Sequence, residues 1–179
     1  MNSEYKDKLL KRRERLSDGE VFEMFTFTNL IAIDRFEKKL IWIKDPDIAD
    51  LRMNYYEAEE VVEEFNKINF AGYNDWRLPK IEDLIKLIDT AKVLAPESPI
   101  NEFLNKIGFE NVRAKYYLTS DLCLQYLDYI KVIDMGDGTE GTASMAKPTF
   151  YLWPVRDIKN DSQACPIHSG GVAKFKEIL

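Results

Sequence analysis

The chain has 179 residues, of which 45% are hydrophobic and 31% are charged, a composition typical of a globular domain and not of a disordered segment. A formal net charge of −6 argues against general nucleic-acid binding, and no run approaches the roughly 18 apolar residues of a membrane span. One histidine, His168, and two cysteines, Cys123 and Cys165, argue against a zinc site and against Ser-His-Asp or Cys-His chemistry. We therefore expect no metal and no cofactor.

The N-terminal region is basic, whereas the remainder of the chain is acidic. Residues 1–18 carry six Lys or Arg and four Asp or Glu, and Tyr5, Leu9 and Leu10 recur at helical spacing. This pattern predicts a helical extension, with a helix over residues 3–16. The helix either lies on the body of the protein, forms a homodimer contact or serves as a basic arm for a membrane surface or a nucleic acid. The region lacks the apolar run of a secretory signal, so a cytoplasmic location is expected.

Short strands are predicted at the start of the body. The alternation over residues 21–28 is typical of a strand, and both of its faces are apolar, which indicates a central position in a sheet. Two further strands are predicted over residues 30–34 and 39–44, with residues 35–38 as the turn between them. An Asp-Pro-Asp sequence ends the third strand.

Three helices are predicted next. Residues 54–68 carry apolar side chains at the i, i+3, i+4 and i+7 positions, and five Glu on the remaining circumference indicate a solvated face. A turn-rich segment, residues 70–79, leads into a second helix with an apolar stripe of its own. A short third helix is predicted over residues 100–107 and ends at Gly108.

The last part of the chain is predicted to be β-structure. Strands are expected over residues 116–119, 129–135 and 149–156, and the glycine-rich residues 136–142 are expected to form a hairpin loop between the last two. The Asp and Gly residues of this loop do not follow the EF-hand spacing, and turn chemistry explains them. Residues 158–179 form a tail that we expect to pack on the domain.

One string in the chain is specific enough to indicate a family. Residues 71–79 read Ala-Gly-Tyr-Asn-Asp-Trp-Arg-Leu-Pro, and weaker matches stand before and after them in the family's order, from Asp34 to Arg156. On these residues the chain resembles the Lcl C-terminal domain family over about residues 20–157. The resemblance implies a domain over residues 19–157 with a C-type-lectin-like α+β fold, in which two main helices lie beside a mixed or antiparallel sheet.

The sequence departs from the family pattern in three places. Lys80 stands where the family usually has Thr, a natural helix N-cap, and Tyr117 stands where it usually has Trp. Family members often carry a leader, and none is expected from residues 1–18, so the extracytoplasmic setting of the family is not carried over.

The residues of the string are expected to act structurally. Trp76 can bury on the order of 200 Å² and anchor the helices to the sheet. Gly72 permits a positive φ, and the forked guanidinium groups of Arg77 and Arg156 can hold carboxylates or carbonyls. The expected structural motif consists of Gly72, Asp75, Trp76, Arg77, Leu78, Pro79 and Arg156.

The resemblance implies a non-enzymatic ligand-binding or protein-interaction module, because such folds present a variable ligand surface on their later β-hairpins. Its partner would be a small molecule, a glycan or a protein. Exposed aromatic residues there could stack on sugar faces or anchor a protein, and charged residues could hold an anionic ligand. The candidate ligand-binding residues are Tyr126, Tyr129, Lys131, Asp137, Glu140, Tyr151 and Trp153.

Two other functions stay open at the level of sequence. A carboxylate-based hydrolase, on a scaffold like that of the formylglycine-generating enzymes, is compatible with the 31 acidic residues. An assembly protein could instead dimerise through residues 3–16. A deep cleft lined by perturbed carboxylates would favour the hydrolase, and a change of mass on removal of residues 1–18 would favour the assembly protein.

Overall fold

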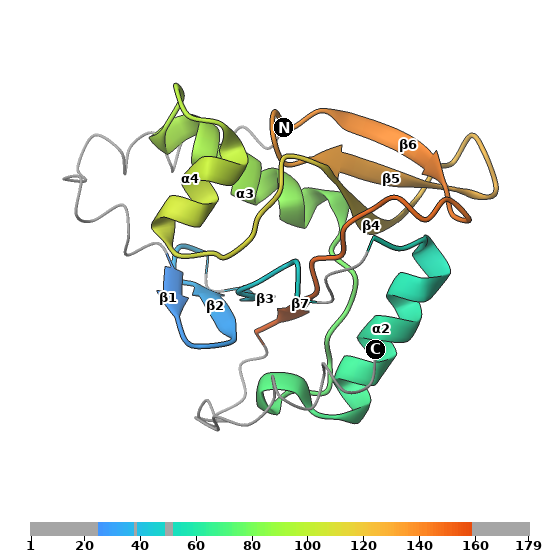
Figure 1. The fold of residues 1–179 in the computed structure, drawn as a ribbon, viewed down its shortest axis with the longest axis horizontal. Helices are drawn as coiled ribbons and strands as arrows, with labels where there is room; N and C mark the ends of the chain where they lie inside the picture. Colours follow the sequence, from blue (N-terminus) through green and yellow to red (C-terminus); the bar gives the residue numbers. More distant parts are fainter. Residues whose placement is uncertain (1–24, 38, 49–51, 159–179) are drawn as a thin grey trace.

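A computed structural model of the chain describes residues 25–37, 39–48 and 52–158. In this part of the chain, two antiparallel sheets and three helices form an α+β fold (Figure 1). The α+β class is therefore confirmed, and its C-type-lectin-like form stays a prediction. The predicted N-terminal helix and the tail beyond Ile158 lie outside the described residues.

The first sheet joins the beginning and the end of the described chain. Its strands are β1 (Phe25–Phe27), β2 (Ile31–Asp34), β3 (Leu40–Ile43) and β7 (Val155–Asp157). They lie in the order β1-β2-β3-β7, and every neighbouring pair is antiparallel. Among the described residues β1 is an edge strand, in contrast to the central position predicted for residues 21–28. Its apolar character has another cause, because Phe25 and Phe27 both pack edge-to-face on Phe109.

Three helices follow the pattern expected from the sequence. They are α2 (Tyr55–Lys67), α3 (Ile81–Leu94) and α4 (Ile100–Ile107). A capping box opens α2, in which the Asn54 side chain accepts the Glu57 N–H and the Glu57 side chain accepts the Asn54 N–H. Helix α4 ends at Gly108, where φ is 126° and an added Cβ would lie 2.8 Å from the Phe27 ring. Only glycine fits this helix end.

The second sheet is a meander of three antiparallel strands. They are β4 (Tyr116–Leu122), β5 (Tyr129–Asp134) and β6 (Glu140–Ser144). Strand β6 is absent from the sequence-based prediction, because its residues, Glu-Gly-Thr-Ala-Ser, lack the apolar alternation of a half-buried strand. The hairpin loop predicted over residues 136–142 is consequently a shorter turn, and it joins β5 to β6.

A crossing segment replaces most of the strand predicted over residues 149–156. Phe150 forms an isolated bridge with Met53, Tyr151 forms one with Tyr117, and only β7 continues as a strand. The segment changes partner every few residues because it passes from the second sheet to the first (Figure 1).

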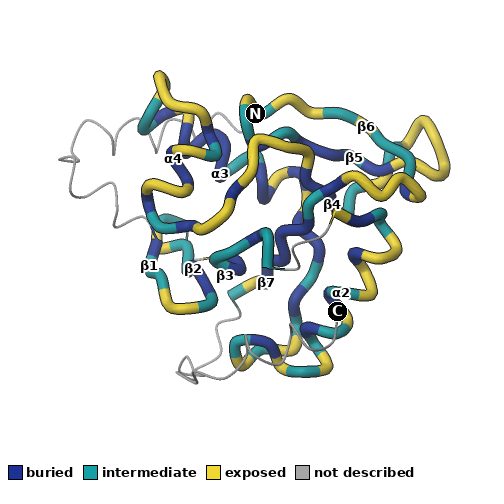
Figure 2. Tube along the Cα trace, viewed as in Figure 1, coloured by how far each residue is buried: buried dark blue, intermediate teal, exposed yellow. Residues whose placement is uncertain are grey.

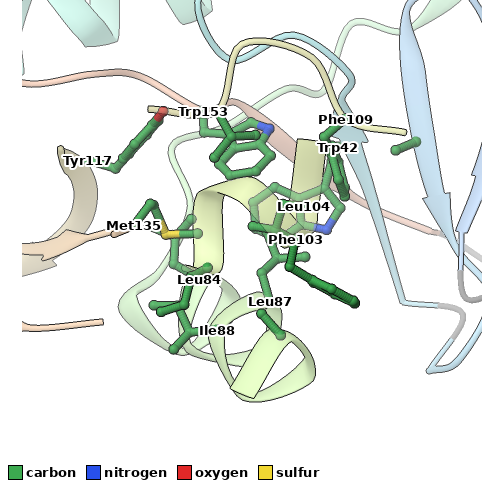
Figure 3. Close-up of a cluster of buried hydrophobic side chains, with 14 of the residues drawn as sticks. Trp42, Leu84, Leu87, Ile88, Phe103, Leu104, Phe109, Tyr117, Met135 and Trp153 are labelled. Atoms are coloured by element: carbon green, nitrogen blue, oxygen red, sulfur yellow. The ribbon is translucent and has the colours of Figure 1, made fainter. Parts of the chain in front are cut away.

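Buried side chains form two clusters. Figure 2 marks the buried positions along the chain in dark blue. The first contains the edge-to-face pair Trp42 and Trp153, with ring centroids 5.4 Å apart, above the buried faces of α3 and α4 (Figure 3). The second contains Phe65, Phe70 and Trp76. Alternate residues of β3 contribute to opposite clusters, because successive strand side chains point to opposite faces.

Candidate functional site

The Gly-Tyr-Asn-Asp-Trp-Arg-Leu-Pro string is bound to α2 through Trp76. The Trp76 indole is 3% exposed, and its Nε1 donates to the Phe70 carbonyl at 3.0 Å. The Asn66 side chain of α2 accepts the Trp76 N–H at 2.7 Å and donates to the Trp76 carbonyl at 2.9 Å. Gly72, with φ at 86°, closes the 3₁₀ turn that leads into the string. Trp76 is therefore the anchor between α2 and this segment.

Two arginines connect the string to β7. Arg156 forms a bidentate pair with Asp75 at 2.6 and 3.1 Å, and its guanidinium carbon lies 3.9 Å from the centre of the Tyr73 ring. Arg77 donates to both oxygens of Asp157 at 2.9 and 3.0 Å, and these hydrogen bonds hold the pKa of Asp157 below its usual range. Both guanidinium groups are thus engaged inside the domain.

The N-terminus of α3 is held from two sides. Lys80 occupies the N-cap position and makes no side-chain capping hydrogen bond. Instead, Asp121 on β4 accepts the Ile81 N–H at 2.5 Å. Asp83 accepts the Lys80 N–H at 2.9 Å and an Arg77 N–H at 2.8 Å. Both carboxylates also lie where the helix dipole favours negative charge.

Leu78 and Pro79 connect the string to the second cluster and to β4. Leu78 is buried in the second cluster, and the Pro79 carbonyl accepts the Ser120 N–H of β4 at 2.8 Å. The backbone of Arg77 exchanges two hydrogen bonds with Val155 at 2.8 and 3.0 Å. The string therefore fixes the relative positions of α2, α3, β4 and β7, which is the arrangement expected of a structural motif.

The candidate ligand-binding residues do not converge on one site. Tyr126 and Tyr129 lie at the β4–β5 loop, with ring centroids 5.4 Å apart. Asp137 and Glu140 lie at the β5–β6 turn, at the other end of β5 and about 20 Å away at the rise of an extended strand. Lys131 lies between these two ends, in the central strand of the sheet.

Two further candidates pack into the fold. Trp153 is fully buried in the first cluster, where its Nε1 donates to the Ile43 carbonyl at 2.8 Å. Tyr151 is half-buried, and its ring centre lies 5.5 Å from that of Tyr117. The assignment of Trp153 to a ligand surface is therefore corrected, because the crossing segment directs this indole into the core.

The β4–β5 loop presents an apolar surface of which Tyr126 and Tyr129 were sequence-based candidates and the leucines were not. Leu124 and Leu127 are 101% and 97% exposed, and Leu122 is 54% exposed. The Cys123 N–H donates to the Tyr129 carbonyl at 2.8 Å, which closes the loop at its base. Figure 2 shows the loop as an exposed end of the second sheet. We define the apolar tip as Leu122, Leu124, Tyr126, Leu127 and Tyr129.

A small cavity lies between the first sheet and α3. Its volume is about 10 Å³, which is room for a single water molecule, and its wall includes Asp34 and Asp83. Burial raises the pKa of Asp34, whose carboxylate accepts the N–H groups of Phe36 and Glu37. Asp34 therefore holds the turn after β2 in place, and Asp83 holds the start of α3.

In the part of the chain that the structure describes, no three His, Cys, Asp or Glu side chains are grouped to hold a metal ion. None of the described helices is long and apolar enough to cross a membrane.

The geometry defines a class of protein: an α+β domain whose aromatic and arginine string joins two helices to two antiparallel sheets. The family model of the Lcl C-terminal domain matches residues 33–156, well over half of the chain. The chain belongs to the Lcl C-terminal domain family, as its resemblance indicated. A comparison with curated proteins gives no match.

Proposed function

We propose that this domain is a non-enzymatic recognition module, and that its apolar tip inserts into an apolar pocket of a partner protein. The observation that carries the proposal is the nearly complete exposure of Leu124 and Leu127. Exposed apolar surface is unfavourable in water by roughly 25 cal/mol per Å². Contiguous patches of this kind on soluble proteins mark interaction surfaces.

The form and charge of the loop favour a protein over a glycan or a membrane. Leucine side chains offer no flat face to a sugar, and the Tyr126 and Tyr129 rings are inclined to each other at 49°. Asp121 and Asp128 stand at the two ends of the loop, and the chain carries a net charge of −6, so an anionic membrane would repel it. A projecting apolar loop matches a concave pocket in a protein.

Hydrogen bonds fix the chain on both sides of the apolar tip. Just before the loop, β4 is fixed by the hydrogen bonds of Ser120 to Pro79 and of Asp121 to Ile81. Just after the loop, the Asp128 carbonyl accepts a backbone N–H from the end of β6 at 2.9 Å. A loop that is already ordered loses little conformational entropy on binding. The family string thus supports the tip through β4.

Site-specific photo-crosslinking identifies the partner, with benzoylphenylalanine in place of Leu124 in the full chain. The matched control carries it in place of Thr139, which is exposed on the β5–β6 turn. The captured protein is then purified and titrated calorimetrically with the intact chain. We expect the double variant Leu124→Ser, Leu127→Ser to bind at least about tenfold more weakly, because both leucines lose a buried contact. Thr139→Ala should bind as the intact chain does.

Folding does not confound this comparison. The substituted leucines are exposed, so the free energy of unfolding should change by no more than about 0.5 kcal/mol. Unchanged affinity of the double variant would contradict the proposal. Flotation with vesicles of phosphatidylcholine and phosphatidylserine that is lost in the same double variant would assign the tip to a membrane surface and also overturn it.

A further inference from the structure

The second sheet has an open edge among the described residues. β6 is the last strand in the order β4-β5-β6, and no described strand pairs with its outer side. Proteins usually protect such edges with lysine, proline, a bulge or a covering segment. Strand β6 contains none of these within its five residues, and Glu140 is its single charge. Within the described part of the chain, the outer edge of β6 is therefore unpaired.

Hydrogen bonds at the two ends of β6 establish which residues face outward. The Asp134 N–H donates to the Thr139 carbonyl, and the Met145 N–H donates to the Asp128 carbonyl, both at 2.9 Å. Bonded and non-bonded pairs alternate along an antiparallel ladder, so every second residue between these two bonds faces β5. The backbone N–H groups that point outward belong to Glu140, Thr142 and Ser144.

We infer that β6 accepts an extended peptide of another protein as an added antiparallel strand, with an acidic side chain on the face of the sheet that carries Lys131. Lys131 pairs with Thr142 across β5 and β6, so their side chains share one face of the sheet. A peptide residue opposite Thr142 lies on that face, two strand spacings or about 10 Å from Lys131. None of the ion pairs among the described residues involves Lys131, and the small Thr142 side chain leaves the path open.

The neighbouring cross-strand pairs of β5 and β6 indicate which residues suit the other positions of the peptide. Ser144 pairs with Tyr129, so a peptide residue opposite Ser144 faces an aromatic ring across a small side chain and is best aromatic itself. Glu140 is exposed at the other end of β6, so a basic residue suits the position opposite it. From its N-terminus, the antiparallel peptide therefore reads aromatic, any residue, acidic, any residue, basic.

A peptide fits this edge better than a second copy of the chain does. A stable dimer needs about 800 Å² of buried surface on each partner, and a five-residue edge supplies much less. In an antiparallel self-pairing centred on Thr142, Glu140 would meet Ser144, and Lys131 would gain no acidic partner. The edge shares only Tyr129 with the apolar tip and uses none of its leucines, so this inference does not rest on the proposed function.

Two capped peptides of equal composition test the inference by NMR titration of the ¹⁵N-labelled chain. The first is acetyl-Tyr-Val-Glu-Val-Lys-amide, and the second exchanges its Glu and Lys. We expect the first to shift the amide signals of Thr142 and Ser144 and to bind about fivefold more tightly than the second. In Lys131→Glu the preference should reverse. No shift of these amides at millimolar peptide, or an unchanged preference in Lys131→Glu, would overturn the inference.

A pair of substitutions at one position tests the backbone contact. Proline is tolerated at an edge where the N–H faces outward, so Thr142→Pro should fold but should not bind the first peptide. Thr142→Val keeps the N–H and should bind as the intact chain does. Equal binding by both variants would contradict strand addition. The Leu124→Ser, Leu127→Ser variant should bind normally, and loss of binding there would place the peptide on the apolar tip instead.

Discussion

At Asp34, burial outweighs the hydrogen bonds that the carboxylate accepts. Desolvation raises its pKa above the usual 3.8, although the N–H groups of Phe36 and Glu37 lie 2.8 and 3.3 Å away. The folded chain then binds this proton more tightly than the unfolded chain, so stability falls as pH rises from 3.8 through the folded-state pKa. Asp34→Asn should remove this fall and be more stable at pH 7, because its amide oxygen still accepts both N–H groups. Urea denaturation from about pH 3 to pH 7 measures it.

Asp137 provides a control of opposite sign. It is exposed on the β5–β6 turn, and hydrogen bonding to Thr139 lowers its pKa below 3.8. Its contribution is therefore present above pH 3.8 and is lost as the pH falls through the folded-state pKa. Asp137→Asn should lower the free energy of unfolding at pH 7, whereas Asp34→Asn should raise it. Changes of the same sign would contradict the role of burial at Asp34.

At the scale of elements, the N-terminus of α3 is capped by a side chain of a strand, Asp121 of β4. Because Lys80 does not cap the helix, the Ile81 N–H is satisfied by Asp121 of β4 at 2.5 Å. Asp121→Ala should lower the free energy of unfolding by about 1–2 kcal/mol and should accelerate hydrogen exchange at the Ile81 amide. Glu82→Ala is the matched control, since it removes an exposed first-turn carboxylate and should cost less than about 0.5 kcal/mol. Equal costs of the two substitutions would disprove the cap.

The elements that could be predicted from sequence are those whose signals are local. Helix α2 combines an apolar stripe with the Asn54 and Glu57 box at its first residue, and α4 ends at Gly108. Strand β6 is held by β5 and carries almost no pattern of its own. The cap of α3 comes from a residue 40 positions away, which no local pattern can indicate.

The same distinction applies to the candidate site. The string around Trp76 could be predicted as a joint, since a large aromatic and two arginines in a turn need partners. The leucines of the apolar tip could not, because the apolar run Leu122-Cys123-Leu124 is equally typical of a buried strand. Exposure is a property of the packed molecule, and alternation alone does not specify it.

For the whole molecule, the two buried clusters belong to one cooperative structure. In β3, Trp42 packs in the first cluster and Ile41 in the second, and in β5, Ile133 and Val132 divide in the same way. Neither cluster can lose its packing without releasing a strand that the other requires. Arg77 adds a polar link, since it binds Asp83 at the start of α3 and Asp157 in β7.

A matched pair of core truncations tests this unity. Leu104 of the first cluster and Phe65 of the second are both fully buried, so Leu104→Ala and Phe65→Ala should each cost about 3–5 kcal/mol. In both variants, circular dichroism and tryptophan fluorescence should follow one urea transition, because tryptophans lie in both clusters. Leu124→Ala is the exposed control and should shift the free energy of unfolding by no more than about 0.5 kcal/mol. A separate fluorescence transition in either truncation would mean that the two clusters unfold independently.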